Sequence, residues 1–167
     1  CVISSNSDWE LFIDDSTQFD SLPDCGKNDP RVLTCGLELS GTLGNDGVTL
    51  ADFNGNIKIT GSLPDDEPTT FLKIKGTALD EANFAIVTKD ITRVHGRILV
   101  EANNELAVLN NDAFARLSRG TPDGDFYGRL NFSIINNEAL TTIDLKNVAY
   151  PVVHAADRLE ITDNPEL

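Results

Sequence analysis

Apolar and polar residues alternate along several short segments of the chain from about residue 31 onward. The clearest examples are the segments 37–43, 57–63 and 130–134, where apolar or glycine positions alternate with polar ones. A period of two places successive side chains on opposite faces of a strand, as in an antiparallel sheet with one buried face. Because turn signals such as Asp46-Gly47 separate these segments, we expect an all-β fold: an antiparallel β-sandwich or flattened barrel of about eight to ten strands.

One segment departs from this alternation. In residues 111–119, Asn111 can cap a helix, Phe114 and Leu117 fall on one face, and Gly120 is a plausible stop. We therefore predict one short helix near 111–119, at one end of the sheets. The apolar run 84–87 is interpreted as a strand, and no repeat of the solenoid type is visible along the chain.

The first thirty residues differ in composition from the rest. They carry seven acidic side chains against one basic side chain, Lys27. Within them, Trp9, Leu11 and Ile13 mark one short strand. We interpret residues 1–30 as an acidic N-terminal tether with one strand, and residues 31–167 as a single all-β domain. The strand Trp9–Ile13 either packs on its own domain or completes the sheet of a partner, and the run 159–162 is a second candidate edge.

The composition excludes some classes of protein. The 167 residues are 40% hydrophobic and carry a formal net charge of −14. No apolar run approaches the roughly 18 residues of a membrane-spanning helix. A surface of this charge repels phosphate, so we expect no nucleic-acid partner.

The cysteines favour an oxidising compartment outside the cytoplasm. The sequence contains no Met and starts at Cys1, which is typical of a bacterial lipoprotein whose N-terminal Cys is the lipid attachment site. A shortened chain, or a secreted one whose Cys1 pairs with another molecule, is the alternative. Cys25 and Cys35 flank a turn-rich stretch, and we expect a disulfide between them rather than free thiols or a metal site.

The sequence also offers candidate residues for a hydrolase and for a calcium site. A small hydrolase would use Glu101 with Glu105, or His154 with Asp157 and Ser133, but no motif supports either set. Calcium is the better candidate cofactor, because acidic loops supply oxygen ligands. Asp123 and Asp125 can contribute from one turn and Asp46 from another. None of these loops matches the EF-hand pattern, and Asp and Asn are also ordinary turn residues.

These patterns lead to one functional expectation and one alternative. We expect a non-enzymatic, secreted or lipid-anchored protein of a bacterial cell envelope, with no required cofactor. It acts as a structural subunit of an envelope complex or filament, or as a surface-binding module, through β edges and acidic loops. The alternative is a calcium-assisted domain that binds a carbohydrate or another small ligand.

Overall fold

The computed structural model describes about half of the chain, in segments that span its length. The described residues are 2–3, 10–13, 31–33, 36–40, 57–59, 70–89, 91–94, 97–110, 112–115, 117, 131–144 and 158–167. The strands are β1 Val2–Ile3, β2 Glu10–Ile13, β3 Arg31–Leu33, β4 Gly36–Ser40, β5 Ile57–Ile59, β6 Thr70–Lys75, β7 Ile91–Val94, β8 Arg97–Glu101, β9 Val108–Leu109, β10 Asn131–Ile135, β11 Thr142–Ile143 and β12 Arg158–Thr162, and the helix is α2 Glu81–Thr88.

Every strand pairing in the described residues is parallel. The largest sheet has the order β12-β10-β8-β6-β4-β2, and two smaller sheets have the orders β1-β3-β5-β7 and β11-β9. Five strands of the largest sheet, β4 to β12, have side chains that are described at least in part. The core is thus a parallel sheet with one helix, an arrangement of α/β character, and the expected antiparallel sandwich is wrong.

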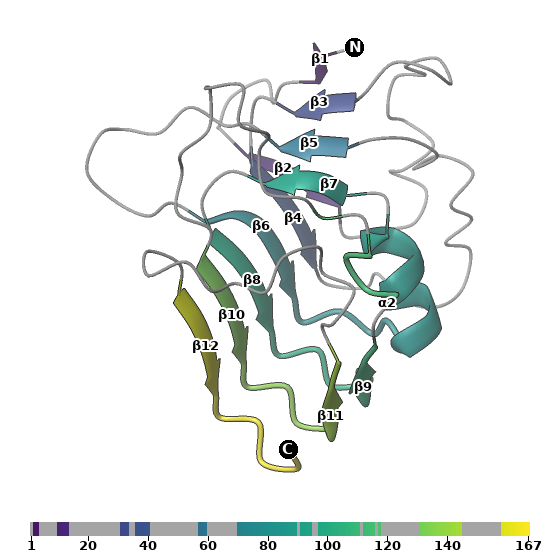
Figure 1. Ribbon diagram of the computed structural model, residues 1–167, viewed down its shortest axis with the longest axis vertical. Coiled ribbons are helices and arrows are strands. Elements are labelled where there is room, and N and C mark those ends of the chain that lie inside the picture. Colours follow the sequence, from purple (N-terminus) through teal and green to yellow (C-terminus); the bar gives the residue numbers. More distant parts are fainter. Residues whose placement is uncertain are drawn as a thin grey trace.

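The chain winds as a coil in which successive strands belong to different sheets. It passes from β3 to β4, on to β5 and β6, and again from β7 to β8, so each of these circuits adds one strand to the same edge of the four-stranded sheet and of the largest sheet. Figure 1 shows the resulting stack of strands from the N-terminal end to β12. The alternation of apolar and polar residues correctly predicted strands with one buried and one solvent-facing side, but it carries no information on strand direction. In a coil the buried face lines the inside, and the return connections make neighbours parallel.

The coil repeat escaped sequence analysis because its circuits differ in length. Leu72, Ile98 and Phe132 occupy the same position on consecutive strands, at intervals of about 26 and then about 34 residues. A search for one fixed period misses such a repeat, although solenoids are recognised by periods of about 20 to 50 residues. The structure therefore contains a coil repeat that is not visible in the sequence as a fixed period.

The helix lies at a different place from the predicted one. Asp80 caps the N-terminus of α2, where its carboxylate oxygen accepts the Asn83 N–H at 2.9 Å. The cap stabilises the start of this helix, which contains the apolar run 84–87, so the strand expected there is wrong. Within the predicted helix 111–119, the described residues 112–115 form turns, and Phe114 has a φ of 54°, which an α-helix cannot contain. Phe114 and Leu117, which were expected on one face of that helix, are both buried although the segment is not helical.

Two columns of apolar side chains fill the inside of the coil against the largest sheet. One column contains Leu37, Leu72, Ile98 and Phe132, and the other contains Leu39, Ile74, Val100 and Ile134; each of these side chains is at most 1% exposed. Phe114 packs edge-to-face on Phe132 and on Phe84 of α2, with ring centroids 5.3 and 5.9 Å apart. Burial of these side chains is the main source of stability for the described core.

A left-handed residue follows each of four consecutive strands of the largest sheet. These residues are Gly76, Ala102, Asn136 and Asp163, with φ between 55° and 63°. Gly, Asn and Asp adopt this conformation readily, whereas Ala does so at a cost.

We expect Ala102→Gly to raise the free energy of unfolding by about 0.5 to 1 kcal/mol, because glycine removes the steric cost of the positive φ. Urea unfolding of the two proteins measures the change. Ala107→Gly, at an exposed position outside the positive-φ set, is the control and should lower stability. Equal losses for both variants would contradict the assignment of strain to Ala102.

Candidate functional site: the open edge of strand β12

Strand β12 is the last strand of the largest sheet. It pairs with β10 in register, with Phe132 opposite Leu159 and Ile134 opposite Ile161. Within the described part of the chain no further strand pairs with its other edge. The run 159–162, a candidate edge in the sequence, is thus a strand, and it lies at the end of the sheet that the described residues form. An unpaired strand edge presents backbone donors and acceptors to which another strand can bind.

The turns after these strands are joined by a line of hydrogen-bonded side chains, which we call the amide ladder: Thr77, Asn103, Asn137 and Asn164. The N–H groups of the first three residues donate to the Oδ1 of the next member, at 3.1, 3.0 and 2.9 Å. The Asn side chains also donate to strand carbonyls, as Asn137 Nδ2 does to Val100 O and Ile135 O. Thr77, Asn103 and Asn137 are buried, so the ladder satisfies backbone groups that lie away from water.

A second line of hydrogen bonds runs through the left-handed residues. Gly76 N–H donates to Glu101 O, Ala102 N–H to Ile135 O, and Asn136 N–H to Thr162 O. Each strand and its turn, which together we call a rung, thus gives two backbone donors to the rung that follows. In the last rung these donors are the N–H groups of Asp163 and Asn164, and no described residue accepts them.

The apolar columns also end at β12. Phe132 and Ile134 are fully buried, whereas Leu159 is 47% and Ile161 is 40% exposed. Leu167 is 52% exposed, and it follows Asn164 by the same three positions that separate the buried Leu140 from Asn137. We call the outer edge of β12, with Leu159, Ile161, Asp163 and Asn164, the tail edge. It has the apolar side chains and the open donors that a further rung would cover.

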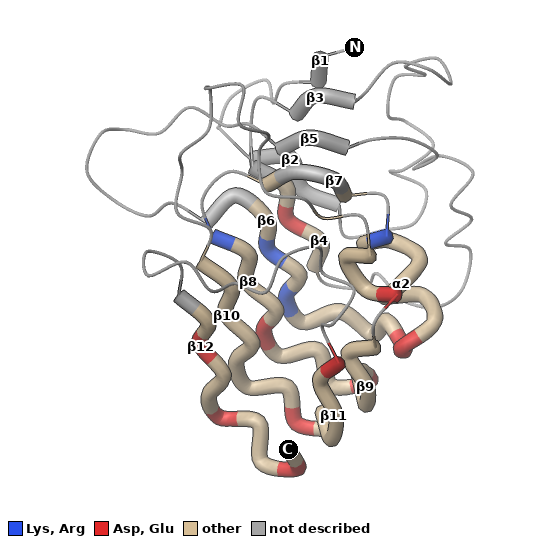
Figure 2. The backbone as a smooth tube through the Cα atoms, viewed as in Figure 1, with Lys and Arg blue, Asp and Glu red and all other residues tan. Residues whose placement is uncertain are grey.

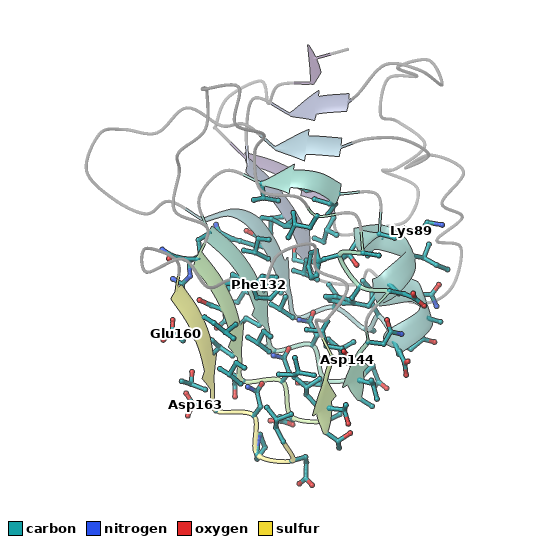
Figure 3. All side chains as sticks on the ribbon, viewed as in Figure 1. Lys89, Phe132, Asp144, Glu160 and Asp163 are labelled. Carbon is teal, nitrogen blue, oxygen red and sulfur yellow. The ribbon has the colours of Figure 1, made fainter. Side chains whose placement is uncertain are left out.

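The outer face of the sheet holds β12 in place through a polar cluster. Arg97 Nε donates to Ser133 Oγ at 3.0 Å, Ser133 Oγ donates to Glu160 Oε2 at 3.2 Å, and Arg97 Nη2 lies 3.5 Å from the same carboxylate oxygen. Figure 3 shows Glu160 on the outside of β12 and Phe132 inside the coil. This cluster ties three neighbouring strands together, so β12 presents its edge from a fixed position.

Charge at the tail edge is mainly acidic. Glu160, Asp163 and Glu166 lie along β12 and the turn after it, as the red segments in Figure 2 show. Glu160 is paired with Arg97, and farther from the edge, on the outer face of the same sheet, Lys73 Nζ lies 3.5 Å from Glu38 and Lys75 Nζ 3.0 Å from Glu101. Ion pairs at the protein surface contribute at most about 1 kcal/mol each.

Most residues singled out from the sequence lie outside the described residues. They are Cys1, Trp9, Cys25, Cys35, Asp46, Asp123, Asp125, His154 and Asp157. Lipid attachment at Cys1, the Cys25–Cys35 disulfide and calcium at the three Asp residues therefore stay predictions. So do the partner-strand role of Leu11 and Ile13 and the tether of residues 1–30; β2 itself pairs with β4.

Three of the residues considered for a hydrolase, Glu101, Glu105 and Ser133, lie in the described part of the chain. Glu101 is ion-paired with Lys75 on the outer face, and Glu105 is exposed in the turn after β8. Ser133 is bound by Arg97 and Glu160. Among the described residues, no group of three or more His, Cys, Asp or Glu is placed to hold a metal ion. The single helix that they include is too short to cross a membrane.

Comparison with known proteins returned nothing: no family model, no curated protein and no solved structure matches this chain. The tail edge is therefore interpreted from its own geometry. The sequence does contain a signal for it, which the analysis of alternation missed. Asn is followed three positions later by Leu at Asn103–Leu106, Asn137–Leu140 and Asn164–Leu167, each time after a strand.

Proposed function

We propose that this chain is a non-enzymatic structural module that assembles with protein by adding a parallel rung to its tail edge. The observation that carries the proposal is the N–H of Asn164 at the end of the amide ladder, which no described residue accepts, on the same strand and turn as the exposed Leu159 and Ile161. An incoming strand with apolar residues two positions apart would cover the two columns. A side-chain oxygen three positions after its second apolar residue would accept the Asn164 N–H.

The proposal agrees with the assembly role expected from the sequence. Strand addition gives affinity through main-chain hydrogen bonds and specificity through alternate side chains. Strand addition requires no cofactor and no reacting group. In this proposal the polar cluster of Arg97, Ser133 and Glu160 holds β12 in position for the incoming strand. The secreted or envelope-bound setting and the participation in a complex or filament remain predictions from the sequence.

A synthetic peptide with the sequence of residues 131–144 tests the tail edge, because it contains a complete rung: strand, left-handed residue, ladder Asn and following Leu. We expect the full chain to bind it and Ile161→Lys to weaken binding at least about tenfold, since a buried charge without a partner costs more than one hydrogen bond. Fluorescence anisotropy of the labelled peptide measures the affinity.

Two controls make this result specific. Thr162→Lys places the same charge on the neighbouring, exposed position of β12, outside the apolar columns, and should leave binding within about twofold. A peptide of the same composition in scrambled order should not bind. Equal binding by wild type and Ile161→Lys, or no binding by the wild type, would remove the proposed function.

A further inference from the structure

We propose that the partner at the tail edge is a second copy of this chain, whose strand β2 adds in parallel to β12. This inference rests on the proposed function and names its partner. The largest sheet has two ends, β2 and β12, and all its strands run in one direction. A copy displaced along the stacking direction therefore brings its β2 beside β12 with the strand direction that the sheet requires (Figure 1).

The register of the sheet supports this pairing. Leu11 of β2 is the register partner of Leu37, and the register continues strand by strand from Leu37 to Leu159. Ile13 is the register partner of Leu39, and that line of partners ends at Ile161. Placing β2 of one copy on β12 of another, at the register used throughout the sheet, therefore sets Leu11 opposite Leu159 and Ile13 opposite Ile161.

The sequence after β2 meets the requirement set by the amide ladder. Asn164 follows Ile161 by three positions, and Ser16 follows Ile13 by the same number. A serine hydroxyl is an acceptor for a backbone N–H. The residue between, at the offset of the left-handed Asp163, is Asp15, and Asp is among the residues that tolerate a positive φ. The sequence of β2 and the three residues after it therefore supplies the residue types, at the spacings, that a rung added to the tail edge would need.

This pairing is heterologous, since β2 of one copy meets β12 of the next. Each pair of copies therefore still has one β2 and one β12 that can bind a further copy. Repetition gives linear assemblies that do not close after two copies. The net charge of −14 on each copy opposes association, and dissolved salt screens that repulsion. Self-association should therefore strengthen as salt concentration rises, opposite to an assembly held by ion pairs.

Sedimentation velocity of the full chain tests the inference. We expect the weight-average sedimentation coefficient to increase as the protein concentration is raised from about 10 µM to about 1 mM. This range is chosen because a one-rung interface lies at the weak end of protein–protein affinities. The rise should be larger at about 0.5 M than at about 0.05 M salt. Ile161→Lys should abolish it, and Thr162→Lys should preserve it.

A mixture distinguishes the head-to-tail pairing from a tail-to-tail dimer. Ile161→Lys keeps β2 intact, so an excess of this variant should bind to wild-type tail edges and shorten the wild-type assemblies. In a tail-to-tail dimer, assembly would stop at two copies. The variant would then change the size of the wild-type species no more than an equal dilution with buffer does, and that outcome overturns the inference. A wild type that stays monomeric at all concentrations also overturns it.

The two proposals fail separately. If the chain remains monomeric but binds the 131–144 peptide in an Ile161-dependent way, the second copy is wrong and the tail edge remains a strand-binding site. If it neither self-associates nor binds the peptide, both proposals are wrong.

Discussion

Asn137→Ala is expected to lower the free energy of unfolding by about 3 to 5 kcal/mol, because it removes a buried amide group that makes several hydrogen bonds. The Asn137 side chain accepts hydrogen bonds from Asn103 N–H and Nδ2 and donates to Val100 O, Ile135 O and Asn164 Oδ1. Alanine supplies none of these, and the buried Asn103 N–H loses its acceptor. Urea unfolding followed by circular dichroism measures the loss.

Asn104→Ala is the matched control for the ladder. Asn104 is the next residue after a ladder member but is exposed in the turn, so its replacement should change stability by less than about 0.5 kcal/mol. If Asn137→Ala were as stable as Asn104→Ala, the amide ladder would have no structural role, and the argument from the open Asn164 N–H would lose its basis.

The second large effect is expected from Phe132→Ala, which should lower stability by about 3 to 5 kcal/mol. Phe132 is the last fully buried member of one apolar column, beside Leu159 of β12, and its ring meets Phe114 edge-to-face with centroids 5.3 Å apart. Truncation removes this contact and leaves a cavity between strands that pack on both sides. The same urea unfolding experiment measures the change.

Phe132→Leu refines this prediction, because it keeps most of the volume and should cost no more than about 1.5 kcal/mol. Combining Phe132→Leu with Phe114→Leu in a double-mutant cycle isolates the ring contact, for which we expect a coupling of about 0.5 to 1.5 kcal/mol. A Phe132→Ala loss below about 1 kcal/mol would mean that this column is not the core of the protein.

Alternation predicted which residues of the strands are buried, but not how the strands are arranged. In 37–39 and 132–134 the apolar positions line the inside of the coil as expected. Strand direction depends on the connections between strands, which local alternation does not contain. The helix was misplaced because a short apolar run such as 84–87 also fits a buried strand, and the prediction took no account of Asp80, whose side chain caps the helix. At 111–119 the reverse happened: a plausible cap and spacing were overruled by the left-handed Phe114.

The candidate site was predictable only in part. The run 159–162 could be identified as a candidate edge from its alternating pattern, and the structure places it at the end of the sheet. The ladder residues Asn103, Asn137 and Asn164 were overlooked because Asn is common in turns, and only their stacking in space gives them a shared function. Spacing alone could have revealed them, through the Leu three positions after each Asn.

Hydrogen–deuterium exchange of the full chain, with and without the 131–144 peptide, tests most directly whether the tail edge accepts a rung. With peptide bound, we predict slower exchange of the amides in 158–164, because β12 gains a strand partner and the Asp163 and Asn164 N–H groups gain acceptors. The amides of the buried strand β8 should be unchanged. Unchanged exchange throughout 158–164 at a peptide concentration that saturates binding would contradict the account.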